Sequence, residues 1–414
     1  MNPNQIYTLV YIFTTFPPEV SGSARFNWER VQWLAKQEKY RVVVLTNHWE
    51  EADVPTVPPG LEKNLIIETF PSKPWIVYNL LRVPTFSAAR LIRQRLAYYQ
   101  PDIITVVDLE GLFFFSTWHL VGRNYARKHG IPYITEYRTD YYSIIQSSTY
   151  PAWNLVKELF VKPISIYLYH QCDATLAISP AASRSLKQLG ISNAHQVLVR
   201  GVDLSALNPS RRNRKCLEPW LTAQEQNNKV IFFLGRVAFE KRIDLLIQAF
   251  ARLKPRQEKF SLIIAGDGPV DIVNKLKRLA QPIPNIHFIG FIFGETKANL
   301  LASCDVFCSP SPYETFGGAM VEAMASGIPV VSVNSGGVSD YMIDGVNGYL
   351  VPPNDVDGLT NALEKALSDD NTEIIQKALQ DAQQLSSEQG CQNLDNYYQQ
   401  LLNSKPTSYS PVMH

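Results

Sequence analysis

Residues 310–327 read PSPYETFGGAMVEAMASG and follow a short apolar segment at Val306–Cys308. The pattern predicts a strand, a proline-rich turn and a helix that begins near Gly317, with Glu314 before the helix and Glu322 roughly two turns inside it. Unpaired amides and the positive end of a helix dipole attract anions, and glycines let a phosphate approach closely. An ordinary turn with two solvated glutamates is the alternative. We favour a pocket for a molecule with a central diphosphate and hydroxyl-rich groups at both ends.

Length and composition describe a globular chain of two domains. The chain has 414 residues, 45% hydrophobic and 19% charged, which allows a large core. Its net charge of +1 gives no overall attraction to nucleic acid. Residues 1–200 hold 20 Lys and Arg against 15 Asp and Glu, a net charge of +5. This excess could favour an anionic acceptor or a membrane surface, and an ordinary solvated surface explains it equally well.

The cysteines and apolar segments indicate the compartment. An odd number of cysteines without metal-ligand spacing predicts reduced, structural thiols. Met1–Gln5 leads directly into a predicted strand, so no signal peptide is expected. Apolar runs such as Gly111–Val121 fall short of the ~18 residues that span a bilayer. We expect a cytoplasmic protein, with peripheral contact at the inner face of the membrane left open. The cysteines are Cys172, Cys216, Cys304, Cys308 and Cys391.

Predicted strands alternate with predicted helices along both halves, which favours parallel sheets covered on both faces. The pattern predicts one Rossmann-like domain at 1–205 and a second at 206–385. We expect the helix and tail at 386–414 to cross back to the first domain. The two doubly wound α/β domains are expected to face one another across a cleft. The basic run Arg211–Lys215 is interpreted as a solvated linker. Strands are predicted at Ile6–Phe13, Arg41–Thr46, Leu65–Phe70, Asp102–Val107, Ile131–Glu136, Ala174–Ile178 and Val197–Arg200, and again at Val230–Leu234, Ser261–Ala265, Ile286–Ile289, Val306–Cys308, Pro329–Val333 and Gly348–Val351; helices include Gly111–His129, Leu155–Gln171 and Gln376–Leu401.

Three further motifs follow predicted strands of the second half. In the first motif, Arg236 and Lys241 supply two cations that could bind a diphosphate leaving group. Gly235 has no side chain to obstruct it. Ala265–Pro269 and Ser335–Gly337 are tight glycine turns. Each motif alone is also explained by an ordinary surface turn.

Together these residues resemble the retaining, nucleotide-sugar-dependent glycosyltransferases of family 4, which have the GT-B fold. The resemblance is strongest over residues 230–352, and its best match is the Glu-x7-Glu pair at Glu314 and Glu322. The sequence around 302–331 is similar to the bacterial lipid-directed branch, which includes sulfolipid synthases and glycolipid glucosyl- and mannosyltransferases. The ordered set of motifs is specific, although each one is weak.

The resemblance implies a role for each candidate residue. As catalytic groups, Arg236 and Lys241 would neutralise the departing diphosphate and Glu314 would orient the donor sugar. Glu322 would bind the ribose hydroxyls, and the loop at Ile292 would hold the base. The other implied donor-binding residues are Gly22 under the diphosphate, Gly235, Thr315, and Phe316, Gly317 and Gly318 through their amides.

One position departs from the family. After Ile131–Thr135 the family presents a His beside the donor sugar, and this chain has Arg138 in the run Tyr137–Asp140. A guanidinium is permanently charged, so it cannot shuttle a proton near neutral pH, although it can donate to a sugar hydroxyl or a phosphate. We count Arg138 as a donor-binding residue.

The implied mechanism retains the anomeric configuration without an enzymic nucleophile, a metal or a cofactor. Positive charge placed at the leaving phosphate would carry catalysis. Asp355-Val356-Asp357 resembles a metal-binding Asp-x-Asp motif but lies where a helix cap is expected. We predict transfer of a hexosyl group, best glucose from UDP-glucose, to a lipid-linked or polysaccharide hydroxyl. A sugar-nucleotide epimerase and an inactive sugar-nucleotide-binding relative are the alternatives.

Overall fold

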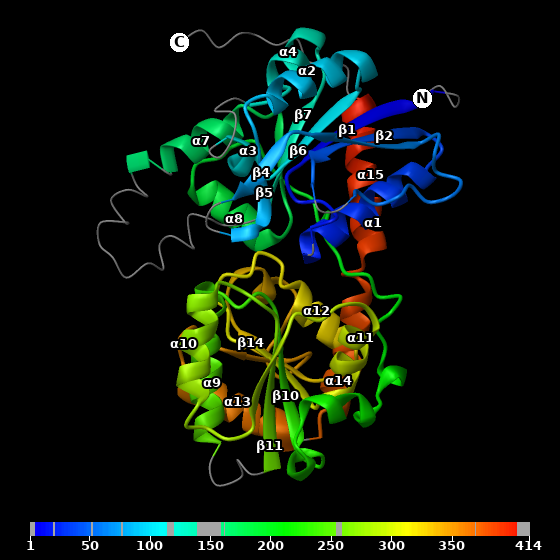
Figure 1. Ribbon diagram of the computed structural model, residues 1–414. Coiled ribbons are helices and arrows are strands. Elements are labelled where there is room, and N and C mark those ends of the chain that lie inside the picture. The colour runs from blue at the N-terminus through cyan, green and yellow to red at the C-terminus, as the bar shows by residue number, and fades with distance from the viewer. Residues whose placement is uncertain are drawn as a thin grey trace. The chain divides into compact units, whose positions relative to one another are not determined.

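The computed structural model divides the chain into two compact units (Figure 1). Unit 1 comprises Met1–Gly201 and Ser387–His414, and unit 2 comprises Val202–Ser386. The structure describes residues 5–19, 21–50, 53–75, 78–113, 120–138, 159–160, 162–253, 259–368 and 370–403.

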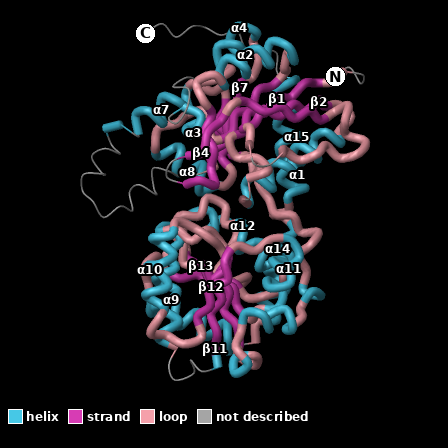
Figure 2. The backbone as a smooth tube through the Cα atoms, in the orientation of Figure 1, coloured by secondary structure: helices cyan, strands magenta, loops and turns pink. Residues whose placement is uncertain are grey.

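Unit 1 is built on a seven-stranded parallel sheet with the order β3-β2-β1-β6-β7-β8-β9. Its central strand β1 is apolar and almost fully buried, as expected for a strand covered on both faces. Helices flank the sheet on both sides (Figure 2). The strands are β1 (Tyr7–Phe13), β2 (Tyr40–Asn47), β3 (Leu65–Phe70), β6 (Ile103–Val107), β7 (Tyr133–Tyr137), β8 (Ala174–Ala177) and β9 (Ala194–Gln196); the described helices are α1 (Gly22–Lys36), α2 (Ala88–Tyr99), α3 (Leu109–Leu112), α4 (Arg123–His129), α7 (Lys162–His170), α8 (Pro180–Gln188) and α15 (Ser387–Asn403).

Helix α15 packs beside α1 in unit 1 (Figure 1). The hydroxyls of Tyr398 and Tyr11 lie 2.6 Å apart in the core, and Thr105 Oγ1 lies 2.9 Å from the same Tyr398 oxygen. Asp395 accepts from the Tyr40 hydroxyl at 2.7 Å and from the Lys39 ammonium at 2.8 Å. The last described residues of the chain are therefore part of the core of unit 1.

Several predicted elements of unit 1 were wrong in detail. The last strand is β9 rather than Val197–Arg200; Val199 is buried and its carbonyl accepts from Arg30 at 3.2 Å. The single helix predicted at Gly111–His129 is represented by α3 and α4, because Gly122 takes a left-handed φ of 90° just before α4. Residues 114–119 lie outside the described part, as do 155–158 and 161 of the predicted helix Leu155–Gln171.

An antiparallel hairpin of β4 (Ser72–Trp75) and β5 (Tyr78–Pro84) is absent from the sequence-based expectations. Pro74 and Pro84 lie inside these strands. Proline has no backbone N–H to donate to a neighbouring strand, so its presence argues against a strand in sequence-based prediction. Both strands of a two-stranded hairpin are edge strands, where proline is tolerated.

Unit 2 is built on a six-stranded parallel sheet with the order β12-β11-β10-β13-β14-β15. Its core between sheet and helices includes Phe233, Phe250 and Leu363, which are almost completely buried. The strands are β10 (Lys229–Leu234), β11 (Phe260–Ala265), β12 (Ile286–Gly290), β13 (Val306–Ser309), β14 (Val330–Val333) and β15 (Tyr349–Val351); the described helices are α9 (Ile243–Arg252), α10 (Val270–Ala280), α11 (Gly294–Ser303), α12 (Gly318–Ala325), α13 (Val356–Ser368) and α14 (Thr372–Gln383).

The helix predicted at Gln376–Leu401 is two helices, α14 and α15. The chain leaves unit 2 between them, and the Val202 amide donates to the Leu385 carbonyl at 2.9 Å at this point. Residues 384–386 between the two helices are not helical, so the single-helix prediction was wrong.

The basic run Arg211–Lys215 is exposed at Arg212 and Lys215, as a solvated segment should be, but its arginines are also bound within unit 2. Arg212 donates to the Cys304 carbonyl at 2.9 Å and to Asp305 at 2.7 Å, and Arg214 donates to Asp305 at 2.9 Å. Asp305 also accepts from the Val230 amide at 2.8 Å. The arginines therefore tie the segment that enters unit 2 to the first residues of β10 and β13.

Each sheet has a point where the strand order reverses. In unit 2 the chain runs from β10 outward to β11 and β12 and then returns to β13 on the other side of β10. In unit 1 it runs from β1 to β2 and β3 and later returns to β6 beside β1. In doubly wound sheets ligands bind outside the carboxyl ends of the strands at these reversals.

Candidate functional site

The loops that follow β10 and β13 meet at the reversal point of unit 2. Lys241 ends a short 3-10 turn at Phe239–Lys241, and its Nζ lies 2.6 Å from Glu314 Oε1. Both side chains are partly accessible, with 20% and 16% of their surface exposed. The Ser311 hydroxyl also donates to the Glu240 carbonyl at 3.1 Å. Two of the three predicted catalytic residues, far apart in sequence, are thus in direct contact.

The loop that carries Glu314 turns into α12 at Gly317. Gly317 has a left-handed φ of 80°, and a Cβ there would lie 2.5 Å from Met320 Cε. The Tyr341 hydroxyl donates to the Gly317 carbonyl at 3.1 Å. The first amides of α12 have no acceptor within the helix, and a Cβ on Gly318 would meet nothing closer than 3.9 Å. The backbone here is fixed and open to an anion.

A third loop, after β14, supports Glu314 and Thr315 from behind. The Gly337 amide donates to the Glu314 carbonyl at 2.6 Å. A Cβ on Gly336 would lie 2.3 Å from the Glu314 carbonyl oxygen, and one on Gly337 would lie 2.2 Å from that of Thr315. Only glycine fits at both positions, so this pair of residues sets the position of the predicted sugar-facing carboxylate.

The remaining charged candidates also have ion partners. Glu322 of α12 accepts from Lys297 of α11 at 2.7 Å, and Arg236 pairs with Glu240 on its own loop. Neither Lys297 nor Glu240 was predicted. Lys297 lies on another element than Glu322 and leaves no local signal in the sequence, whereas Glu240 follows Arg236 by four residues and that spacing could have indicated it. Partly exposed ion pairs contribute about 0–1 kcal/mol each, so an anionic ligand can replace a glutamate at little cost.

Gly266 and Gly268 hold the loop of Gly235 in place. A Cβ on Gly266 would lie 1.8 Å from the Gly235 carbonyl oxygen, and one on Gly268 would lie 1.9 Å from that of Val237. The Gly235 amide donates to the Ala265 carbonyl at 3.0 Å. The glycine turn at Ala265–Pro269 therefore packs backbone against backbone beneath the cationic loop.

The loop predicted to hold a base follows β12. The Ile292 side chain is 7% exposed, whereas Phe291 and Phe293 on either side are exposed and their rings stack with centroids 6.1 Å apart. The Gly266 amide donates to the Gly290 carbonyl at 2.7 Å, which joins this loop to the glycine turn. A planar ligand would meet the two phenylalanine rings or the backbone of Ile292.

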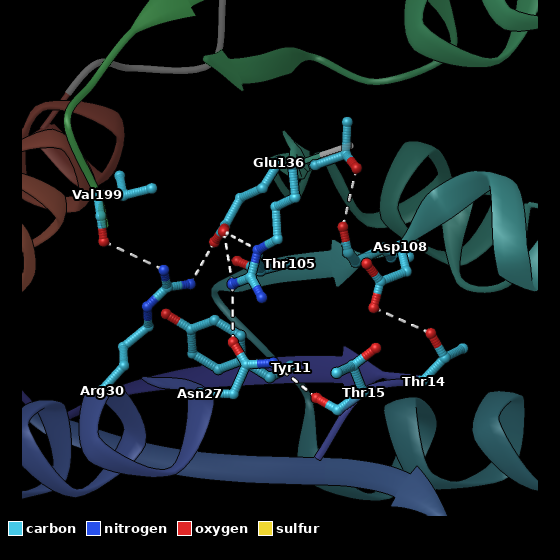
Figure 3. Close-up of polar contacts among 12 residues, drawn as sticks. Tyr11, Thr14, Thr15, Asn27, Arg30, Thr105, Asp108, Glu136 and Val199 are labelled. Atoms are coloured by element: carbon cyan, nitrogen blue, oxygen red, sulfur yellow. Dashed lines mark hydrogen bonds and ion pairs between the residues drawn. The ribbon is translucent and has the colours of Figure 1, made fainter. Parts of the chain in front are cut away.

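Two predicted residues, Gly22 and Arg138, lie in unit 1. Gly22 begins α1, where Ser21 Oγ accepts from the Ala24 amide at 3.1 Å, and a Cβ on Gly22 would meet nothing within 4 Å. Arg138 follows β7 and is buried (Figure 3). Its Nη2 donates to Glu136 Oε2 and to Asn27 Oδ1, both at 2.7 Å.

Glu136 is bound by two guanidinium groups, because Arg30 of α1 contacts its other oxygen (Figure 3). Burial alone would raise the pKa of the Glu136 carboxyl, but Arg138 and Arg30 outweigh it and bring the pKa to about 2. The Asn27 amide group in turn donates to the Thr15 carbonyl at 2.6 Å. Arg138 is thus a fixed cation connected to the loop after β1.

Two other expectations concern metals and membranes. Asp355 Oδ1 accepts from the Gly358 amide at 2.8 Å, which confirms that the Asp-x-Asp run begins a helix as a cap. Among the described residues, no group of three or more His, Cys, Asp and Glu side chains is arranged to hold a metal ion. None of the helices within the described ranges is long and apolar enough to cross a membrane.

Comparison with known families and proteins covers both units. Residues 219–384 match Glycosyl transferases group 1, and residues 20–206 match Glycosyltransferase Family 4. A GDP-mannose-dependent alpha-mannosyltransferase of Mycobacterium tuberculosis is 30% identical over 351 residues, which is 82% of each chain. The sulfoquinovosyl transferase of Arabidopsis thaliana is 29% identical over 74% of this chain and 58% of its own length.

Solved structures share the fold. Sucrose-phosphate synthase from Thermosynechococcus elongatus matches with a TM-score of 0.76 at 18% identity, over 96% of this chain and 100% of that one. Anabaena HepE in complex with UDP and glucose matches with a TM-score of 0.71 at 20% identity, over 95% and 100% of the two chains. These likenesses confirm the predicted fold class, two doubly wound α/β sheets of the GT-B type.

Proposed function

This chain belongs to glycosyltransferase family 4, and we propose that the carboxyl edge of the unit 2 sheet is its donor site. The chain is a nucleotide-sugar-dependent hexosyltransferase. The observation that carries the assignment of the site is the ion pair of Lys241 with Glu314 at the reversal of β10 and β13. It places a cation and an acceptor-only carboxylate beside the first turn of α12, where a diphosphate and a sugar meet in one ligand.

Donor binding proceeds by exchange of ion partners. A diphosphate oxygen takes the place of Glu314 on Lys241, and Arg236 contributes a second cation because its side chain is 53% exposed. The amides of Phe316, Gly317 and Gly318 bind the phosphate nearest the sugar, beside Thr315 and Gly235. Glu314, released from Lys241, then accepts hydrogen bonds from the sugar hydroxyls.

The second carboxylate works in the same way. Glu322 leaves Lys297, or shares it, and accepts from both ribose hydroxyls. The loop at Phe291–Phe293 supports the base. Gly22 and Arg138 belong to unit 1, and their roles toward the diphosphate and the sugar stay predictions.

Transfer breaks the bond between the anomeric carbon and the phosphate oxygen and forms a bond from that carbon to an acceptor hydroxyl oxygen on the same face. The acceptor proton passes to the departing phosphate, so the products are the glycosylated acceptor and a nucleoside diphosphate. Negative charge grows on the phosphate in the transition state, and the positive charges of Lys241 and Arg236 would stabilise it there.

We propose UDP-glucose as the donor and a lipid-linked or polysaccharide hydroxyl as the acceptor. HepE, which shares the fold, is described in complex with UDP and glucose, and the alpha-monoglucosyldiacylglycerol synthase of Streptococcus pneumoniae is 27% identical over 66% of this chain. GDP-mannose is the second candidate, since the mycobacterial relative is dependent on it by name. The excess of basic residues in 1–200 supports peripheral contact of unit 1 with an anionic membrane surface.

Calorimetric titration with UDP, GDP, UDP-glucose and GDP-mannose, followed by turnover with a bacterial lipid extract, tests the proposal. We expect UDP-glucose to bind and to transfer labelled sugar to an extractable lipid. Lys241→Ala should abolish most of the turnover, and Lys365→Ala, at an exposed lysine of α13, serves as the matched control. Equal turnover in wild type and Lys241→Ala would contradict the assignment of the site.

A further inference from the structure

The reversal point of the unit 1 sheet carries two carboxyl groups. After β1 the chain passes through Thr14–Ser21 into α1, and after β6 it passes through Asp108 into α3. Because β1 and β6 are hydrogen-bonded neighbours, these two loops border the crevice where doubly wound sheets bind ligands. Thr14 Oγ1 donates to Asp108 Oδ2 at 3.0 Å, which joins the loops directly (Figure 3).

Glu19 is buried in the loop after β1, and one of its carboxyl oxygens has no hydrogen-bond partner among the described residues. Only 8% of the residue is exposed, and no hydrogen-bond partner among the described residues reaches its Oε2. Glu19 lies two residues before Ser21, the N-cap residue of α1, so it lies close to the start of that helix. A buried polar atom without a partner is unfavourable, and a bound ligand would supply the partner.

The surroundings favour the neutral form of Glu19. Burial raises its pKa, the Ser21 hydrogen bond lowers it, and the nearby Asp108 raises it again, to about 8. No Lys or Arg within the described ranges forms an ion pair with Glu19; Arg25 of α1 pairs with Glu29, and Arg138 is bound to Glu136. Glu19 in its neutral form can both donate and accept a hydrogen bond, and its loop is joined to Asp108 through Thr14.

Asp108 is held in an unusual backbone conformation. Its φ of 62° is left-handed, a region that Asp tolerates better than most residues but that still costs free energy. The loop opposite is fixed as well, because Asn47 donates to the Thr14 carbonyl at 2.8 Å and Asn27 donates to that of Thr15. These hydrogen bonds fix the two loops that carry Glu19 and Asp108.

We propose that Glu19 binds a hydroxyl group of the sugar acceptor at the β1/β6 reversal, with Asp108 accepting from a neighbouring hydroxyl. The inference rests on the proposed glycosyl transfer and specifies the chemistry of the acceptor end: an uncharged polyol, such as a sugar or glycerol group. An anionic group would meet the Asp108 carboxylate, whereas a hydroxyl completes the hydrogen bonds of Glu19.

The test measures transfer from the active donor to two probes, dioctanoylglycerol and octyl glucoside, by Glu19→Ala, Glu19→Gln and wild type. We expect Glu19→Ala to raise the acceptor KM roughly tenfold or more, with donor KM and slow donor hydrolysis unchanged. Glu19→Gln, which keeps a neutral donor and acceptor, should stay near wild type at pH 7. Glu38→Gln, at an exposed glutamate, is the control, and thermal unfolding checks that each variant is folded.

A pH series separates this role from a structural one. The wild-type acceptor KM should rise as the pH passes about 8 and Glu19 loses its proton, whereas Glu19→Gln should show no such rise. Donor hydrolysis with an unchanged acceptor KM in Glu19→Ala, or no transfer to either probe, would overturn the inference and leave the donor site standing. Failure of the wild type to hydrolyse or transfer from any nucleotide sugar would overturn the proposed function and this inference with it.

Discussion

Lys241 Nζ lies 2.6 Å from Glu314 Oε1, so the two loops that end β10 and β13 are joined by one ion pair. We propose that a bound diphosphate takes the place of the Glu314 carboxylate in this pair. In the absence of a donor, Glu314 neutralises the lysine and joins the two loops.

Removal of the lysine should therefore affect turnover far more than stability. Lys241→Ala should lower kcat/KM by about 2–4 kcal/mol of transition-state stabilisation, since a preorganised charge at a leaving group is worth that much. The free energy of unfolding should change by about 0–1 kcal/mol, because the pair is partly exposed. Steady-state kinetics and chemical denaturation check the two values, and wild-type kinetics would reject the role.

Glu322→Ala should weaken nucleotide binding. Loss of two hydrogen bonds to a charged acceptor predicts a roughly ten- to hundredfold rise in the Kd for the nucleoside diphosphate. Titration calorimetry with the nucleotide alone isolates this effect from sugar contacts. An unchanged Kd would remove the ribose assignment, and Glu364→Ala, on the exposed surface of α13, is the matched control.

Neighbouring glycines should respond differently to alanine. Gly317→Ala forces a side chain into a left-handed φ of 80° and against Met320 and Tyr341, so it should destabilise unit 2 by about 1–2 kcal/mol or more. Gly318→Ala has space on the protein side and should leave the unfolding midpoint unchanged while weakening donor binding. Equal thermal shifts in both variants would contradict the described turn.

The buried Glu136 cluster should make the protein sensitive to acid. The pKa of the carboxyl is about 2 in the folded state and ordinarily 4.5, so its stabilisation is complete above pH 4.5 and is lost as the pH falls towards 2. Glu136→Gln should be less stable at neutral pH by about 3–5 kcal/mol, because Arg30 and Arg138 lose their counter-ion. Its remaining stability should fall less steeply in that acidic window, as measured by denaturation at several pH values.

Arg138→His tests the departure from the family pattern. Histidine cannot contact Glu136 and Asn27 together as the guanidinium does, so the loop after β1 should loosen. We expect an altered donor preference or rate, measured across UDP and GDP sugars. If neither changes, residue 138 has no contact with the donor.

The sequence predicted the parts of the fold that depend on local pattern. Continuous apolar runs such as β1 and β10 and glycines at fixed spacing identify strands and turns without knowledge of their neighbours. Contacts across the chain left no such trace: Lys297 beside Glu322, and Tyr341 beneath Gly317, are ordinary residues on their own elements. The break before α15 was missed for the same reason, since polar helical periodicity runs through both helices.

The return of α15 to unit 1 has a consequence for biosynthesis. Tyr398 and Asp395 complete a core that begins with Tyr11 and Tyr40, so that core stays open until residue 398 has emerged from the ribosome. Unit 2 is formed by one uninterrupted segment of the chain. It can therefore fold during translation before the core of unit 1 is complete. Because Val202 and Leu385 are hydrogen-bonded at its two ends, that segment enters and leaves at one place and could be exchanged as a cassette for the corresponding segment of a relative with another donor.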